Sequence, residues 1–287
     1  AMAVLKEGLN IKLVDCNIKD WNKEIIEIEK KITKKTKAII ATHIYNFPLR
    51  VDILKKICRK NKIILIEDAA EVMGQKLNNK LCGSYGDISI FSFYANKQIT
   101  TGEGGMITTN SKKLYEQSKS LRNLCFGKQD RFNHEDIGWN YRMTNLQASL
   151  GVSQLKRIKS IVSRRHKVGN EYFQKLKNNK NIYIPETKRS YAKNIYWVIA
   201  FVITNKNLKI DAKELMKMLL KYGIQTRPFF WPMHMQKVFR NKYKINIRGK
   251  YKNSEYISKY GLYLPSSLDI KPDQIKFICN KVNTILK

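Results

Sequence analysis

Short apolar runs that alternate with helical patterns constrain the fold of this chain more than any other feature. Two of them, residues 62–67 (KIILIE) and 87–93 (DISIFSF), have the length and β-branched or aromatic content of buried strands. Further strands are expected at residues 12–14, 38–43 and 106–109, and helices at residues 23–32, 51–59 and 111–123. Such alternation is typical of an α/β fold with a mostly parallel sheet and helices on its faces.

The second half of the chain has a different pattern, which predicts a smaller α+β domain. A helix over residues 144–173 would connect the two parts, because its apolar residues recur at helical spacing. Beyond it we expect strands at residues 196–204 and 224–227 and helices at residues 211–222 and 272–286. The chain should therefore divide into a large domain over residues 1–159 and a small C-terminal domain over residues 160–287.

The net charge of +32 comes from 55 Lys and Arg against 23 Asp and Glu. A phosphate-rich partner, with nucleic acid the extreme case, is one interpretation. The basic residues are spread from Lys6 to Lys287, however, without a dense tract or a recognisable nucleic-acid module. Interaction tails usually form blocks of like charge. We therefore expect a basic surface and no nucleic-acid partner.

The cysteines and the apolar runs indicate the cellular setting. The five cysteines are scattered without a C-x-x-C pair, and the four histidines are not closely paired. This pattern supports neither a metal site nor a disulfide framework, and a reducing cytoplasm is expected. No apolar run approaches the ~18 residues that span a bilayer, so no membrane partner is expected.

Asp68 and Lys97 each follow one of the two apolar runs described first. In open α/β sheets, ligands bind outside the carboxyl ends of the strands, where a carboxylate and an amine from two strands can meet. This combination suits pyridoxal phosphate, which needs a lysine for a Schiff base and an acid at its pyridine nitrogen. Considered singly, Asp68 could be a helix N-cap and Lys97 a solvated surface amine.

Four segments together resemble the DegT/DnrJ/EryC1/StrS family of pyridoxal-phosphate-dependent aminotransferases, which act on nucleotide-linked keto-sugars. They are residues 66–110 (IEDAAEVMGQKLNNKLCGSYGDISIFSFYANKQITTGEGGMITTN), 136–147 (DIGWNYRMTNLQ), 226–234 (TRPFFWPMH) and 261–266 (GLYLPS). The motifs occur in order over essentially the whole chain. The resemblance implies fold-type I, the aspartate-aminotransferase-like α/β fold.

The resemblance also implies roles at the cofactor. Lys97 would bind pyridoxal phosphate covalently and then carry protons, and Asp68 would pair with the pyridine nitrogen. Ser92 would contact the phosphate, unless it only satisfies local backbone groups. Asn140 would reach the phosphate pocket of a neighbouring subunit, which implies a homodimer, unless it is a turn residue. Glu71 stands near the cofactor's ring hydroxyl, where many relatives carry Gln or His.

On the substrate side the resemblance points to His43, His134, Arg227 and His234. Arg227 is the strongest candidate, since a guanidinium can hold a phosphate bidentately. A core histidine with satisfied hydrogen bonds is a nearly equal alternative for His43. The aromatic residues at 229–231 are expected to belong to the core.

The implied reaction transfers the amino group of glutamate to a nucleotide-diphospho-4-keto-6-deoxyhexose, in perosamine-type synthesis for surface polysaccharide or O-antigen. A few relatives carry histidine in place of this lysine and dehydrate the sugar, so Lys97 favours transamination. Relatives also carry an upstream segment with a Ser-Gly-Thr phosphate-binding turn, and residue 1 falls beyond it. A non-catalytic or truncated fragment is therefore the alternative.

Overall fold

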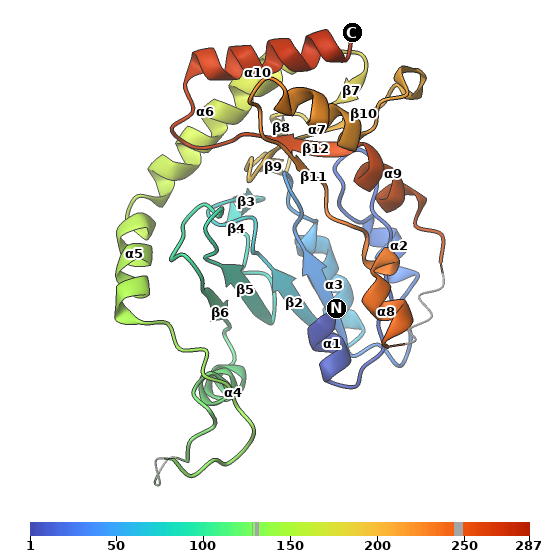
Figure 1. The fold of residues 1–287 in the computed structure, drawn as a ribbon. Helices are drawn as coiled ribbons and strands as arrows, with labels where there is room; N and C mark the ends of the chain where they lie inside the picture. The colour runs from blue at the N-terminus through green and yellow to red at the C-terminus, as the bar shows by residue number, and fades with distance from the viewer. Residues whose placement is uncertain (128, 130–131, 244–248) are drawn as a thin grey trace.

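The central sheet of the computed structural model contains four strands and is mostly parallel (Figure 1). The structure describes residues 1–287 except 128, 130–131 and 244–248. In spatial order the strands are β1 (Ala38–Thr42), β2 (Ile64–Asp68), β5 (Ile88–Ser92) and β6 (Gly105–Thr108). The first three are parallel, and β6 is antiparallel to β5. This confirms the predicted α/β class and brings the carboxyl ends of β1, β2 and β5 to one edge.

The crossover from β1 to β2 is the helix α3 (Val51–Lys60), which covers the sheet with its apolar side. Its buried residues Val51, Leu54 and Cys58 recur every three or four positions, which is the spacing of one helix face. These residues belong to one core cluster with Leu65 of β2. The helix therefore anchors the two strands whose ends carry Thr42 and Asp68.

A second sheet is entirely antiparallel and carries the C-terminal helices on one side (Figure 1). Its spatial order is β11 (Arg227–Pro228), β12 (Gly261–Leu264), β10 (Ile199–Ile203) and β7 (Ile182–Tyr183). It shares a core with α6 (Ile158–Leu176), α7 (Ala212–Leu220) and α10 (Pro272–Ile285). This arrangement is the predicted α+β part, although the domain boundary at residue 159 stays a prediction.

The remaining elements are short or lie at the periphery. The other α-helices are α1 (Met2–Lys6), α2 (Ile25–Glu29), α4 (Lys112–Arg122), α5 (Asn145–Leu155), α8 (Lys237–Asn241) and α9 (Lys252–Tyr260). Two 3-10 turns and two hairpins complete them: η1 (Lys206–Leu208), η2 (Met233–Met235), β3 (Lys76–Leu77) with β4 (Lys80–Leu81), and β8 (Lys188–Arg189) with β9 (Ala192–Lys193). Within the described residues, no helix combines the length and apolarity needed to cross a bilayer.

Two predictions of secondary structure are wrong, and of the strand expected at residues 224–227 only Arg227 lies in a strand, β11. Residues 12–14 form no strand, because the following Asp15 accepts hydrogen bonds from the backbone of Asn253 and Ser254 and so ties this segment to α9. The helix expected over residues 144–173 is two helices, α5 and α6, separated at Lys156 and Arg157. Neither residue is a helix breaker. The division instead follows packing, because α5 has no buried residue whereas α6 packs into the C-terminal core.

Candidate active site

Asp68 ends β2, at the edge where the parallel strands finish. Thr42, its register partner on β1, donates from Oγ1 to Oδ2 of Asp68 at 3.5 Å. The backbone N–H of Ala70 donates to the other carboxylate oxygen at 3.2 Å. The carboxylate is therefore held in a fixed direction at the sheet edge, and it is only half-buried, so a ligand can reach it.

Lys97 lies in the turn that follows β5, five residues after Ser92. Its Nζ is 4.1 Å from the centroid of the Trp197 ring. Burial lowers the pKa of Lys97, while the charges of Glu71 and Asp68 oppose that shift. Among the described residues, Lys97 forms no ion pair within 4.0 Å. An unpaired amine with a lowered pKa is the form of lysine that can act as a nucleophile or a base.

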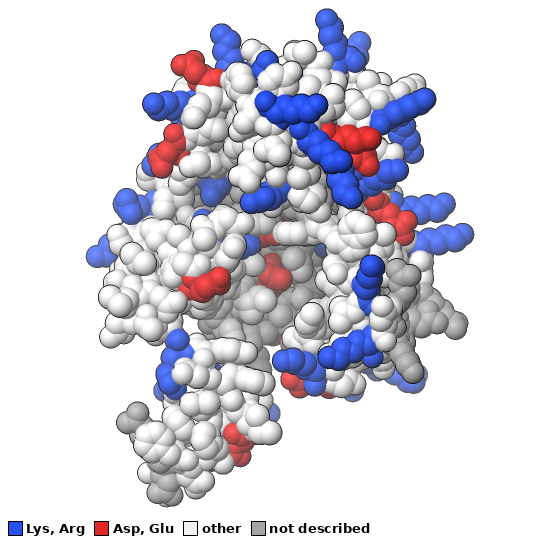
Figure 2. All heavy atoms as spheres, in the orientation of Figure 1, with Lys and Arg blue, Asp and Glu red and all other residues white. Residues whose placement is uncertain are grey.

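Glu71 is a second acid beside this amine, and it is almost completely buried. Its Oε2 accepts a 2.6 Å hydrogen bond from the backbone N–H of Tyr45. Burial raises the pKa of Glu71 to about 7, and the opposing influences are this hydrogen bond and the charge of Lys97. Figure 2 shows acidic side chains in the hollow between the two parts of the molecule, whereas Lys and Arg are scattered over the outer surface.

Aromatic side chains form one side of the site. We call Trp21, Tyr45, Trp197, Phe229 and Phe230 the aromatic wall. The Tyr45 ring stacks on Phe229 at 4.4 Å, on Phe230 at 5.4 Å and on Trp197 at 6.1 Å between centroids. Trp21 packs edge-on against Phe229 at 4.9 Å. The wall therefore joins the central sheet to the segment before β12, which contains Arg227.

The backbone beneath this wall is strained. Trp21 and Tyr45 have φ values of 62° and 61°, and Tyr196, next to Trp197, has a φ of 50°. Bulky residues rarely adopt this left-handed region, and each instance costs ~1–3 kcal/mol. Strain of this kind persists where surrounding contacts impose it, and it clusters at functional sites.

The two remaining cofactor candidates lie in different surroundings. Ser92 ends β5 at the same edge as Asp68, and its Oγ accepts a 3.3 Å hydrogen bond from the backbone of Tyr94. Asn140 is exposed and pairs through a single bridge with Asn123, in the segment around α4 that projects away from the body of the molecule (Figure 1). Ser92 can thus share a ligand with Asp68, while Asn140 faces outward.

His43 lies in the core, which favours the core-histidine alternative, and its assignment as a substrate residue stays a prediction. Its side chain is 0% exposed. The N–H of Leu49 donates to Nδ1 at 3.0 Å, so Nε2 carries the proton and donates to Oε1 of Glu67 at 3.0 Å. Both ring nitrogens are used, as in the core histidine that was the alternative.

The other substrate candidates differ in whether their side chains already form a hydrogen bond or an ion pair. Arg227 is exposed on β11, opposite Tyr263 in the ladder, and among the described residues it forms no ion pair. His234 uses Nε2 in a 2.9 Å contact with Oε1 of Glu255. His134 donates from Nδ1 to the carbonyl of Leu124 at 2.6 Å and lies in the projecting segment. Arg227 is therefore the substrate candidate that is open to an anion.

Sequence reasoning missed Lys23, a second amine near the two acids. Burial lowers the pKa of Lys23, against the attraction of Cys16, Glu71 and Asp68. It follows Asn22, whose side-chain amide donates to the Phe47 carbonyl at 2.8 Å and so fixes the local backbone. Nothing distinguishes Lys23 from the other lysines in the sequence, so no signal could have found it.

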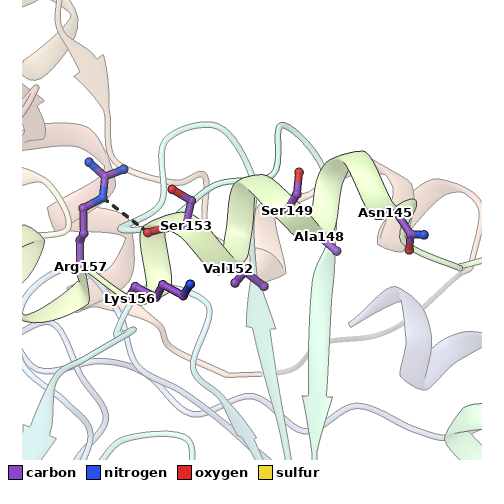
Figure 3. Close-up of a pocket in the computed structure, with 7 residues that line it drawn as sticks. All are labelled: Asn145, Ala148, Ser149, Val152, Ser153, Lys156 and Arg157. Atoms are coloured by element: carbon purple, nitrogen blue, oxygen red, sulfur yellow. Dashed lines mark hydrogen bonds between the residues drawn. The ribbon is translucent and has the colours of Figure 1, made fainter.

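A groove of about 640 Å³ lies on α5, apart from the residues described above. Figure 3 shows Ser149, Ser153 and Arg157 on one side of the helix and Ala148, Val152 and Lys156 on the other. None of the predicted site residues lines it.

Comparisons with known proteins show what this chain is similar to. A model of the DegT/DnrJ/EryC1/StrS aminotransferase family matches residues 1–283. The GDP-perosamine synthase of Escherichia coli O157:H7 is 33% identical over 282 residues, which are 98% of this chain and 74% of that protein. The GDP-perosamine synthase of Vibrio cholerae is 34% identical over 254 residues, 88% of this chain and 68% of that protein. The structure of Helicobacter pylori PseC, an aminotransferase involved in the biosynthesis of pseudoaminic acid, superimposes with a TM-score of 0.92 at 25% identity. It covers 100% of this chain and 76% of PseC.

Proposed function

Because the chain belongs to the DegT/DnrJ/EryC1/StrS aminotransferase family, whose members depend on pyridoxal phosphate, we propose that it aminates a nucleotide-diphospho-4-keto-6-deoxyhexose in perosamine-type synthesis. Glutamate is the proposed amino donor. The observation that carries this proposal is the unpaired, half-buried amine of Lys97 beside two carboxylates. Two relatives that are about a third identical are GDP-perosamine synthases, which supports the choice of sugar.

The donor set fits pyridoxal phosphate. When bound, this cofactor supplies an aldehyde that condenses with amines and a ring that withdraws electrons from the adjoining carbon. Lys97 offers the amine, and Asp68 offers a carboxylate that can keep the pyridine nitrogen protonated. Ser92, at the same sheet edge, has a hydroxyl whose proton is available to a phosphate oxygen.

Lys97 would also move the proton. Its lowered pKa raises the neutral fraction of the amine at a given pH, so Nζ is better able to accept a proton from the amino donor and to supply one to the acceptor sugar. Glu71, with a pKa of about 7, lies close enough to Lys97 for the two charges to interact, and it can buffer the charge of that amine. The aromatic wall keeps bulk water from one side of the site.

Arg227 would bind the nucleotide part of the substrate. Its guanidinium is exposed without an ion pair among the described residues, and Arg227 lies two residues before Phe229 of the aromatic wall. A planar guanidinium suits the paired oxygens of a diphosphate. His234 and His134 remain proposed substrate contacts, although one ring nitrogen of each is already bonded.

We also propose a homodimer in which Asn140 enters the partner's site. The helix α5 presents Leu146, Leu150 and Leu155 to solvent, with Leu146 81% exposed. Exposed apolar patches of this kind mark protein–protein interfaces. The projecting segment before α5 exposes Ile137 and Tyr141 as well, so a second copy would cover one continuous surface.

The five free, buried cysteines fit the reducing cytoplasm expected from the sequence.

The decisive experiment follows the amino group. The protein is incubated with pyridoxal phosphate, GDP-4-keto-6-deoxymannose and glutamate that carries a nitrogen isotope, and the sugar product is analysed by mass spectrometry. We expect the label in the product, no label with Lys97→Ala, and full labelling with Lys34→Ala as the surface-lysine control. A dehydrated, unlabelled sugar, or normal turnover by Lys97→Ala, would contradict the proposal.

A further inference from the structure

Trp197 contacts the proposed catalytic lysine more closely than any other aromatic residue described. Lys97 Nζ lies 4.1 Å from the centroid of its ring, well within the ~6 Å range of a cation–π interaction. The indole Nε1–H donates to the carbonyl of Asn96 at 3.3 Å. One side chain therefore holds both the amine and the turn that carries it.

The position of Trp197 is imposed from several directions. Arg165 on α6 donates to the carbonyl of Trp197 at 3.0 Å and more weakly to that of Tyr196. The Tyr196 N–H donates to the Asn194 side chain at 2.9 Å. The Ile195 N–H donates to the carbonyl of Asn46 at 3.1 Å, one residue beyond Tyr45. These bonds hold Tyr196 in its left-handed conformation.

The strained backbone has a definite effect on the two side chains. The Tyr196 ring enters the core of the C-terminal part and packs against Gly169, where an added Cβ would come within 2.2 Å of it. The Trp197 ring points the other way, into the aromatic wall beside Tyr45. The strained backbone at Tyr196 therefore lets the two neighbouring rings point in opposite directions and places the Trp197 indole over Lys97.

We propose that Trp197 is the positioning residue for Lys97: its ring face holds the amine whenever the amine is not covalently engaged, and its Nε1–H fixes the turn. The inference rests on the proposed aminotransferase function. In that reaction, Lys97 is released when an amino substrate takes its place on the cofactor. The released amine must then stay within reach of the proton it transfers, and the flexible lysine side chain has no ion pair among the described residues to keep it there.

The contact can be measured without cofactor or turnover. An aromatic ring shifts the NMR signals of protons above its face upfield. In the cofactor-free protein with labelled lysine, we expect the ε-CH2 signal of Lys97 upfield of the range of lysines that contact no ring, with Lys97→Ala assigning it. Trp197→Leu should return this signal to the ordinary range, and Trp197→Phe should leave part of the shift. An unshifted signal in the wild-type protein, or a shift that survives Trp197→Leu, would overturn the inference.

The chain contains a matched control. Lys281 Nζ lies 4.2 Å from the Tyr222 ring, in the C-terminal part and far along the chain from Lys97. Tyr222→Leu should reduce the upfield shift of Lys281, leaving the part due to the Phe277 ring at 5.5 Å, and should leave the shift of Lys97 unchanged. If Tyr222→Leu moved the Lys97 signal, the shift would report the general fold and not the Trp197 ring.

The kinetic consequence is tested on the cofactor-loaded protein. Trp197→Leu should slow amine transfer from glutamate about tenfold, because a partly desolvated cation–π contact has roughly this effect. The KM for glutamate should change little, Trp197→Phe should recover most of the rate, and borohydride should still trap the cofactor on Lys97. An unchanged rate would overturn the positioning role. If the wild-type protein took up no cofactor, the proposed function would fail, while the NMR measurement would still decide where the amine lies.

Discussion

The backbone N–H of Tyr45 donates a 2.6 Å hydrogen bond to Oε2 of Glu71 and so connects the segments that follow two neighbouring parallel strands. The Tyr45 hydroxyl in turn accepts a 2.8 Å hydrogen bond from the N–H of Phe230, which precedes the second sheet's strand β12. One residue thus contacts an acid of the site, the aromatic wall and the segment that carries Arg227.

Glu71→Gln should change how stability depends on pH. The pKa of Glu71 rises from 4.5 to about 7 on folding, so its ionisation destabilises the folded protein progressively as the pH rises through this window. At about 1.4 kcal/mol per pH unit, the effect is at most ~3 kcal/mol. Gln keeps an acceptor for the Tyr45 N–H but does not ionise. Urea unfolding at pH 5 and pH 8 should show the variant gaining stability relative to wild type at the higher pH. An equal difference at both pH values would contradict this prediction.

Glu67→Ala should be strongly destabilising. Its buried carboxylate accepts hydrogen bonds from His43 and from the backbone of Gly83, Tyr85 and Gly86. Removing the acceptor leaves these buried donors unpaired, which we expect to cost ~3–5 kcal/mol. Glu67→Gln retains one acceptor oxygen and should cost ~1–3 kcal/mol. Chemical denaturation measures both, and Glu27→Ala, at an exposed ion pair, should stay within ~0.5 kcal/mol of wild type.

Burial opposes ionisation of Glu67, but the hydrogen bonds from His43 and the backbone prevail and lower its pKa. Its stabilising contribution is therefore present above the pKa of the unfolded chain and is lost as the pH falls. Wild-type stability should decline on acidification more steeply than that of Glu67→Gln. A parallel decline in the two proteins would show that Glu67 is not ionised in the fold.

Arg227→Ala should raise the KM for the nucleotide-sugar about 10- to 100-fold, because charge-assisted hydrogen bonds contribute ~1.5–3 kcal/mol. The kcat should change little, since the proposed contact of Arg227 is with the nucleotide part of the substrate and not with the reacting carbon. Arg164→Ala is the matched control, because its guanidinium pairs with Asp269 on the surface. Steady-state kinetics separate the two constants, and a fall in kcat with an unchanged KM would place Arg227 at the chemistry instead.

Asn140 can be tested by complementation between subunits. Lys97→Ala and Asn140→Ala should each be inactive or weak alone. If Asn140 completes the partner's site, a mixed dimer contains one site with both defects and one with none. Random mixing should then restore about a quarter of wild-type activity. No recovery in verified mixed dimers would place Asn140 in its own subunit's site.

The central sheet could be predicted because its strands appear in the sequence as short, β-branched apolar runs that alternate with helical patterns. The runs do not show that apolar residues on these strands stay exposed, as Ile40, Ile64 and Ile90 do at 44%, 47% and 36%. Asp68 and Lys97 were found because the ends of parallel strands converge. Each of these inferences depends on local pattern plus one general rule of α/β topology.

The remaining features depend on tertiary contacts. The two ring nitrogens of His43 are hydrogen-bonded to Leu49 and to Glu67 of another strand, β2. No sequence pattern distinguishes such a histidine from one that binds a substrate. Phe229 is buried as expected, but the neighbouring Phe230 and Trp231 are 51% and 59% exposed. Trp197 becomes important only because distant segments place it over Lys97. The break between α5 and α6 has no local signal either.

The left-handed conformations of Trp21, Tyr45 and Tyr196 bear on how this protein could be engineered. A method that only relieves backbone strain would propose glycine at all three positions, because glycine adopts such φ values freely. Each replacement would also remove an almost fully buried aromatic side chain, whose loss costs ~3–5 kcal/mol against the ~1–3 kcal/mol of strain relieved. Glycine at these positions should therefore lower heat resistance, and at position 196 it would also loosen the indole over Lys97, so backbone strain alone is a poor guide to stabilising substitutions here.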